Sequence, residues 1–250
     1  MGISIDNLER IAAGGWQAPA VEQLGEWQLR AADGFTGRAN SALAVGDPGR
    51  DLPDAIDHVT RWYQARDLIP MVSVGFPLGR PEDSRADVLL AARGWGIHHA
   101  AIVMTASTAE AAAPAAPVEV VVTAAPDEGW LSLYQYRGQP PPPISGALLM
   151  SAPWQAFASV RDNGRTVAVG RVAVSEGWAG LTAVAVDPGH RRRGLGVALT
   201  AALAQAAAAQ GAPRMYLQVE TGNTAAQALY ARCGFTSHHA YHYRVHPATA

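Results

Sequence analysis

The chain has 250 residues, 49% of them hydrophobic and 16% charged, which fits one large core or two ordinary ones. Its net charge of −2 gives no electrostatic case for binding nucleic acid or an anionic membrane. The N-terminal residues lack the basic start and apolar core of a signal peptide, and no apolar run reaches membrane-spanning length. The single cysteine, Cys233, cannot form an internal disulfide, which fits a reducing cytoplasm. Together these features predict a soluble, cytoplasmic protein.

The first hundred residues predict alternating strands and helices. Strands are expected over residues 28–32, 40–45, 71–74 and 99–104, and helices over residues 53–67 and 84–93. In the longer helix, Ile56, Val59 and Tyr63 recur at the spacing of one helical face, which predicts that this face is buried.

Residues 105–117 consist mainly of Ala, Ser, Thr and Pro, a composition typical of a linker. We therefore expect a domain over residues 1–108, an Ala/Pro linker over 109–117 and a second domain over 118–250.

The second domain also alternates strands and helices. Strands are expected over residues 118–123, 157–160, 166–174, 181–186, 215–220 and 241–245. Helices are expected over residues 127–137 and 144–150, on either side of four prolines at 140–143, and after Gly194 and Asn223. Asn-Gly and Glu-Gly dipeptides mark two of the turns as hairpins.

The strand over residues 181–186 leads into a candidate anion site. It is followed by the turn Asp187-Pro188-Gly189, three arginines at 191–193 and a helix whose first turn holds Gly194 and Gly196. The first N–H groups of a helix lack partners and carry partial positive charge, so phosphate binds there. The glycines let the backbone approach a phosphate, and the arginines add donors. An arginine-capped turn without a ligand is the alternative.

The pattern Arg191-x-x-Gly194-x-Gly196 after a strand resembles the pyrophosphate-binding motif of the GNAT superfamily of N-acetyltransferases, which bind acetyl-coenzyme A there. Asn223, with Tyr230 seven residues later and a closing Gly234-Phe235, resembles the superfamily's other characteristic stretch. The resemblance implies an α/β fold with a mixed sheet and direct transfer of acetyl from acetyl-CoA to a primary amine. It implies acetyl-CoA contacts on the central strand, the following loop and two helix starts: Val184, Ala185, Val186, Arg191, Arg192, Arg193, Gly194, Leu195, Gly196, Val197 and Asn223.

Three short matches, each separated by 140 positions, indicate that the chain contains a duplicated unit. They pair residues 47–49 with 187–189, 94–95 with 234–235 and 98–99 with 238–239. At the same offset, Asp51, Asp54 and Ile56 replace the arginine and two glycines of the anion site. Carboxylates at a helix start cap its N–H groups and repel phosphate. We therefore expect two tandem GNAT-like domains, of which the N-terminal one is degenerate and lacks the cofactor site.

The resemblance places the catalytic tyrosine of the superfamily at Tyr230, which would donate a proton to the departing thiolate. Helical spacing alone also allows Tyr230 to be an ordinary core residue. The central strand carries no carboxylate that could accept the proton of the amine. Glu220 is therefore the candidate base, and Glu176 is another. For both residues, the alternative is an ordinary surface carboxylate without a catalytic role. The resemblance assigns carbonyl polarisation to backbone N–H groups around Val184 and Val186.

Several alternatives remain open at this point. The prolines at 140–143 are either a plain connector or, as the resemblance suggests, one wall of the acceptor cleft. Adjacent histidines on a strand point to opposite faces, so we expect no metal site at the His-His pairs. The partners that we expect are acetyl-CoA and an unidentified amine, with no nucleic acid or membrane, and we expect a monomer or a homodimer. The rival function is a non-catalytic acyl-CoA sensor or interaction module.

Overall fold

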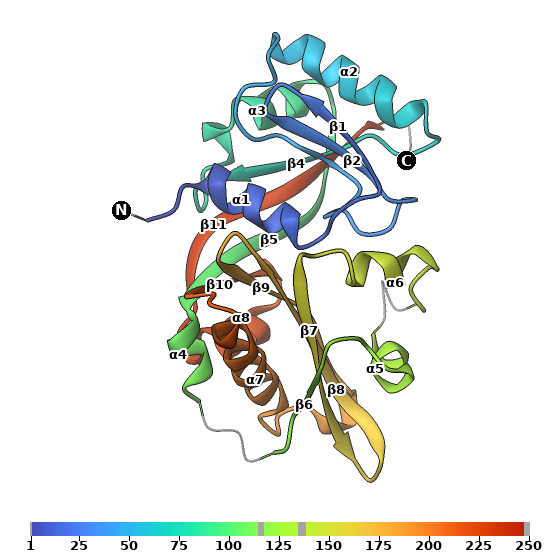
Figure 1. Cartoon of the computed structure of the whole chain (residues 1–250). Helices are drawn as coiled ribbons and strands as arrows, with labels where there is room; N and C mark the ends of the chain where they lie inside the picture. Colours follow the sequence, from blue (N-terminus) through green and yellow to red (C-terminus); the bar gives the residue numbers. More distant parts are fainter. Residues whose placement is uncertain (1, 115–117, 135–138, 248–250) are drawn as a thin grey trace. The chain divides into compact units, whose positions relative to one another are not determined.

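The computed structural model describes residues 2–114, 118–134 and 139–247. The helices and strands group into two compact units (Figure 1). One unit comprises Met1–Val103, Gly146–Ser151 and His238–Ala250, and the other comprises Met104–Ser145 and Ala152–Ser237. Each unit contains both parallel and antiparallel strand pairs, which confirms the predicted α/β class with a mixed sheet.

The first unit contains the elements from the N-terminal part of the chain and most of its last strand. In chain order these are α1 (Ile5–Gly14), β1 (Ala20–Leu24), β2 (Trp27–Ala31), β3 (Ala42–Leu43), α2 (Leu52–Gln64), β4 (Met71–Phe76), the 3-10 turn η1 (Pro81–Asp83), α3 (Arg85–Ala92), most of β5 (Gly96–Ser107), most of α6 (Ile144–Leu149) and most of β11 (Thr236–Val245). Its strand order is β1-β2-β3-β4-β11-β5, and β3 and β4 run parallel. Helix α1 and strand β1 were not predicted from the sequence.

Helix α2 packs on this sheet through the predicted face. Ile56, Val59 and Tyr63 are buried and belong to the core of the unit, together with Trp62. The Tyr63 hydroxyl donates to the backbone oxygen of Arg30 on β2, at 2.8 Å. The amphipathic spacing in the sequence therefore identified the buried side of this helix correctly.

Strand β11 pairs with β4 in antiparallel register, from Ala240 opposite Phe76 to Val245 opposite Met71. A buried carboxylate on α3 anchors it, because Asp87 accepts hydrogen bonds from both His242 and Arg244. The compact units are not continuous in sequence, since the first includes residues 146–151 and 238–250. The predicted domains 1–108 and 118–250 describe the two copies of the sequence repeat, and they remain a proposal.

The second unit contains the remaining elements. They are α4 (Thr108–Ala112), β6 (Val121–Thr123), α5 (Glu128–Leu133), β7 (Trp154–Asp162), β8 (Arg165–Ser175), β9 (Trp178–Val186), the 3-10 turn η2 (Pro188–His190), α7 (Leu195–Ala209), β10 (Arg214–Glu220) and α8 (Thr224–Arg232). The strand order is β10-β9-β8-β7-β6, in which β9 and β10 are parallel and the other neighbours are antiparallel. The end of the helix expected over 127–137 lies outside the described residues.

Helix α4 includes the first residues of the predicted Ala/Pro linker, of which residues 115–117 lie outside the described residues. Ser107 and Glu110 form a capping box, in which the Ser107 side chain accepts from Glu110 N and the Glu110 carboxylate accepts from Ser107 N. Ala111 is fully buried, and the Thr108 hydroxyl donates to Ala212 O at 2.6 Å. Part of the stretch that suggested a linker is therefore a helix in contact with α7.

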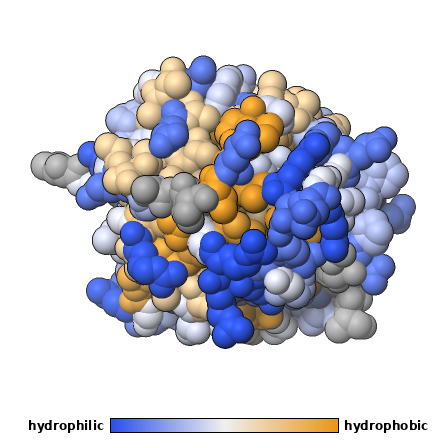
Figure 2. All heavy atoms as spheres, turned by 90° about the horizontal axis from the view of Figure 1, so that it is seen from below, coloured by the Kyte–Doolittle hydropathy of each residue, from blue (hydrophilic) through white to orange (hydrophobic). Residues whose placement is uncertain are grey.

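On the face of the molecule shown in Figure 2, hydrophobic residues near the centre lie beside strongly hydrophilic ones. Exposed large apolar side chains on described elements include Val21 on β1 and Val121 and Val122 on β6. Among the described residues, no helix has the length and hydropathy needed to cross a bilayer.

Candidate active site

In the second unit, two neighbouring parallel strands separate at their C-terminal ends. The pairing of β9 with β10 ends at Leu181 opposite Leu217, although β9 continues to Val186 and β10 to Glu220. The last residues of β9 therefore lie beyond its printed ladder with β10.

A bulge in β9 accompanies this separation. Ala183 has a φ of +53°, in the left-handed region, and the register against β8 shifts between Val169 and Arg171. A bulge adds one residue to one strand and bends it locally. This bend explains why β9 leaves β10 after Leu181.

A cavity of about 880 Å³ lies at this end of β9, next to the starts of α7 and α8. Its lining includes every predicted acetyl-CoA contact except Arg193: Val184, Ala185, Val186, Arg191, Arg192, Gly194, Leu195, Gly196, Val197 and Asn223. Tyr230 also lines it, so the structure brings the two sequence motifs to one cavity.

The backbone N–H groups at the start of α7 are not capped by any described side chain. Gly194 is the N-cap residue, its φ is +77°, and it makes no side-chain cap. No ion pair or side-chain hydrogen bond joins Arg191 or Arg192 to another residue within the described ranges. The first N–H groups of this 15-residue helix and two exposed guanidinium groups thus face the cavity region, an arrangement that suits an anion.

The two glycines of the motif have different structural reasons. At Gly194 a Cβ would meet nothing within 4 Å, so space does not demand a glycine. Its positive φ does, because residues other than glycine rarely adopt that conformation. At Gly196, a Cβ would come 2.7 Å from Cδ1 of Leu229 on α8. Gly196 therefore lets α8 approach α7, a reason for this glycine that the sequence analysis did not consider.

Arg193 and His190 differ from expectation. Arg193 does not line the cavity; its Nη1 donates to Oδ2 of Asp162 at the end of β7, at 3.2 Å. His190 lines the cavity and was not identified from the sequence. Its Nε2 lies 3.2 Å from the same Asp162 oxygen. Because Asp162 precedes His190 by 28 residues, no local pattern indicates this contact.

Tyr230 is half-buried on α8, and its ring meets Phe235 edge to face at 5.9 Å between centroids. Burial, together with the neighbouring Cys233 thiol, raises the pKa of Tyr230 to about 12. The phenol is therefore protonated throughout the neutral pH range. Asn223 both caps α8 and lines the cavity. Its Oδ1 atom accepts a hydrogen bond from Ala226 N at 3.1 Å.

The carboxylates considered as bases lie outside this cavity. Glu220 ends β10 and is exposed, and Glu176 lies in the turn between β8 and β9 with a φ of +49°. None of the described residues that line the cavity is an aspartate or a glutamate. In the described ranges, no group of three His, Cys, Asp or Glu side chains converges as a metal site requires.

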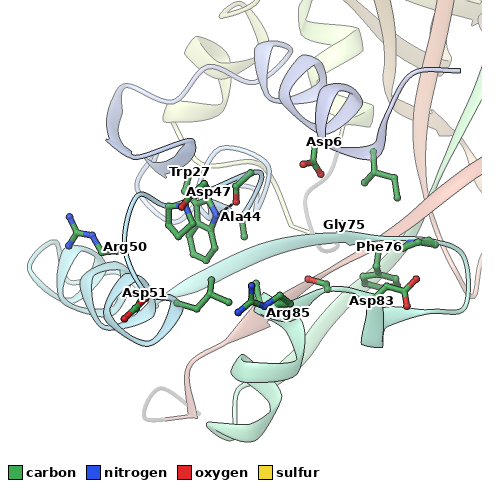
Figure 3. Close-up of a pocket in the computed structure, with 17 residues that line it drawn as sticks. Asp6, Trp27, Ala44, Asp47, Arg50, Asp51, Gly75, Phe76, Asp83 and Arg85 are labelled. Carbon is green, nitrogen blue, oxygen red and sulfur yellow. Dashed lines mark hydrogen bonds between the residues drawn. The ribbon is translucent and has the colours of Figure 1, made fainter. Parts of the chain in front are cut away.

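The first unit has a pocket of about 700 Å³ at the corresponding place, where β3 and β4 end and α2 and α3 begin (Figure 3). Carboxylates from several elements stand around it: Asp6, Asp47, Asp51 and Asp83. Two arginines, Arg50 and Arg85, also contribute to the lining, and the side chain of Arg50 points away from the centre (Figure 3).

The start of α2 corrects one detail of the sequence analysis. Asp51 is the N-cap residue, yet its side chain makes no cap hydrogen bond, so the carboxylate does not satisfy the helix N–H groups. Ile56 does not block the helix start, because it is buried in the core. Asp51 is therefore expected to repel phosphate through its negative charge at the pocket, and not by capping the helix.

Comparison with known proteins identifies the family. A family model described as "Probable histone acetyltransferase Rv0428c C-terminal" matches residues 3–244. The "Probable histone acetyltransferase Rv0428c" of Mycobacterium tuberculosis is 32% identical over 98% of this chain and 74% of its own length. The "Uncharacterized N-acetyltransferase YobR" of Bacillus subtilis is 29% identical over 96% of this chain and 98% of its own length.

Solved structures share the fold. A GCN5-related N-acetyltransferase from Kribbella flavida superimposes with a TM-score of 0.71 at 19% identity, covering 99% of this chain and 96% of that one. A "Tandem GNAT protein from the clavulanic acid biosynthesis pathway" gives 0.65 at 16% identity, with 96% and 87% covered. The GNAT-like fold implied by the two motifs is thereby confirmed. The chain belongs to the family described as "Probable histone acetyltransferase Rv0428c C-terminal" and is an acyltransferase of the GNAT superfamily.

Proposed function

We propose that the chain is an acetyl-CoA-dependent N-acetyltransferase that transfers acetyl directly to a primary amine. The observation that carries this proposal is the cavity of the second unit, which joins an uncapped helix start, two arginines and Tyr230. The donor set fits a pyrophosphate, because guanidinium groups and helix N–H groups are strong donors to phosphate oxygens. Acetyl-CoA would supply the acetyl group as a thioester.

Each role in the transfer has a candidate in this chain. Arg191, Arg192 and the backbone N–H groups at the start of α7 bind the anionic part of the ligand. The end of β9, from Val184 to Val186, offers backbone groups beyond its ladder with β10 for polarising a carbonyl. Tyr230 donates a hydrogen bond and a proton to the sulfur that leaves.

The proton of the amine needs another acceptor. An alkylammonium group has a pKa near 10, so the acceptor arrives mostly charged and must lose a proton before attack. Since no described carboxylate lines the cavity, we assign this step to water, with Glu220 as the group that receives the proton at a distance.

The acceptor is a primary amine of unidentified nature. One relative carries the name of a probable histone acetyltransferase, so a lysine-containing peptide is the first acceptor to test. Small amines and aminoglycosides are the next, because acceptor specificity depends on loops and not on the motif.

The second candidate is a non-catalytic acyl-CoA sensor. The lack of an acidic residue among the described cavity residues favours it, whereas Tyr230 in the cavity favours the enzyme. Both candidates bind acetyl-CoA, so binding alone does not distinguish them.

The test is the Tyr230→Phe variant, assayed for thiol release and for acetyl-CoA affinity. An enzyme that uses Tyr230 as its acid loses about a hundredfold or more in kcat and keeps its Kd for acetyl-CoA. The control is Tyr134→Phe, which removes a hydroxyl at the end of α5, away from the cavity lining. Equal turnover in Tyr230→Phe and wild type would remove the proposed acid, and binding without turnover on any amine would establish the sensor.

A further inference from the structure

The loop between β9 and α7 is tied to the hairpin formed by β7 and β8. The Oδ2 atom of Asp162, the last residue of β7, lies 3.2 Å from His190 Nε2. The same oxygen accepts from Arg193 Nη1 at 3.2 Å. One carboxylate on the hairpin therefore holds two residues of the loop that carries the predicted phosphate contacts.

The other side of the His190 ring contacts a second carboxylate. Its Nδ1 lies 3.3 Å from Oδ1 of Asp187, which opens the loop. Asp187 also accepts from Gly189 N at 2.9 Å and from Arg165 Nη2 of β8 at 2.7 Å. The hydrogen bond from His190 and that from Gly189 N lower the pKa of Asp187, so it is ionised at neutral pH.

The His190 ring thus stands between two carboxylates, with Asp162 on its Nε2 side and Asp187 on its Nδ1 side. The charged groups that face or neighbour the ring are these two carboxylates and the guanidinium groups of Arg165, Arg191, Arg192 and Arg193.

We propose that Asp162 and His190 form a clamp that positions the loop for binding the phosphates of acetyl-CoA, which rests on the proposed function. His190 also lines the cavity, so the clamp ends beside the ligand. These residues act through Arg191, Arg192 and the start of α7, and are therefore positioning residues.

The backbone of the loop shows what the clamp has to hold. Arg192 has a φ of +62° and Gly194 one of +77°, both in the left-handed region. For a non-glycine residue such as Arg192 this conformation is unfavourable and needs support from its surroundings. The pairing of Arg193 with Asp162 fixes the residue between these two positions and directs its side chain to the hairpin.

The test is calorimetric titration of the whole chain with acetyl-CoA, comparing wild type with Asp162→Asn and His190→Gln. Both contacts are partly exposed, with Asp162 at 35% and His190 at 21%, so we expect each variant to bind about two- to fivefold more weakly. Asp162→Glu, which keeps the carboxylate, should recover part of the affinity. The matched control is Asp57→Asn, since Asp57 also pairs with an arginine on the surface, at 2.6 Å, but lies in the first unit.

Rescue by Asp162→Glu separates positioning from a general loss of structure, because a variant that keeps the carboxylate can still contact His190 and Arg193. The double variant should lose less affinity than the two single losses combined, because Asp162 and His190 share one contact. If wild type binds acetyl-CoA and all variants bind it equally well, the clamp alone is overturned. If wild type does not bind, the proposed function is overturned as well.

Discussion

At the scale of single residues, the cavity of the second unit depends on where each arginine points. Arg191 and Arg192 line it without a described partner, whereas Arg193 is held by Asp162. The run of three arginines suggests three equivalent phosphate contacts, but side-chain direction divides them. Sequence spacing contains no information on this division, because it depends on a residue of another hairpin.

Replacing Arg191 or Arg192 by Gln should each weaken acetyl-CoA binding about tenfold, the effect of one charge-assisted hydrogen bond of about 1.5 kcal/mol. The loss should shrink at high salt, since exposed charges are screened. Calorimetric titration at two salt concentrations measures it. Arg50→Gln, which removes an arginine just before the start of α2, is the control, and an equal loss in that variant would contradict the assignment.

At the scale of elements, the regular helices and strands followed from periodicity, and the exceptions have identifiable causes. The buried face of α2 and the strands β8 and β10 lie where apolar spacing predicts them. Helix α4 was missed because its alanines resemble a linker, although Ser107 and Glu110 stand at capping-box spacing. The bulge at Ala183 was not predicted, because nothing in a run of small apolar residues signals a positive φ.

The capping box of α4 gives a stability prediction. Ser107→Ala removes the side chain that accepts from Glu110 N, and should lower the free energy of unfolding by about 1 kcal/mol. Urea unfolding measures this difference. Ser132→Ala is a suitable comparison, because that hydroxyl donates to Gly129 O within α5 and caps no helix start; an equal loss in both variants would contradict a specific role for the cap.

Strand β11 depends on the buried carboxylate of Asp87. Burial would raise the pKa of Asp87, but hydrogen bonds from Arg244 and His242 outweigh this effect and lower it to about 2. A lowered pKa stabilises the folded state above the ordinary value near 4, and this contribution is lost as the pH falls from about 4 to about 2.

Asp87→Asn should therefore lower the free energy of unfolding by about 3 kcal/mol at pH 7, because it leaves a buried guanidinium without its counter-charge. The difference from wild type should shrink as the pH approaches 2. Urea unfolding at pH 7 and at pH 3 tests both statements. A constant difference at the two pH values would show that the ion pair is not its source.

At the scale of the whole molecule, the structure adds a repeated feature to the matches seen in the sequence. Arg30 on β2 donates through Nη2 to the Ser41 hydroxyl at 3.2 Å, and Arg171 on β8 donates through Nη1 to the Thr182 hydroxyl at 3.5 Å. Both arginines are buried, and each member of the second pair follows its counterpart by 141 positions. In each pair the arginine lies on one strand and the hydroxyl lies on, or directly before, the next strand of the sheet. This recurrence supports the proposal of a duplicated unit.

The two units differ in the charge around their corresponding pockets. Both helix starts lack a side-chain cap, but among the described residues the second pocket is lined by arginines without carboxylates, whereas four carboxylates stand beside Arg50 and Arg85 in the first. If both descend from one duplicated unit, only the second keeps the features that suit a phosphate. The central claim is therefore one acetyl-CoA site in each chain.

Calorimetric titration of the wild-type chain with acetyl-CoA tests this claim most directly, because it gives stoichiometry together with affinity. The account predicts one site per chain, weakened by Arg191→Gln and unchanged by Arg50→Gln. Two sites per chain would contradict the degenerate first unit, and no binding would contradict the assignment of the cavity in the second.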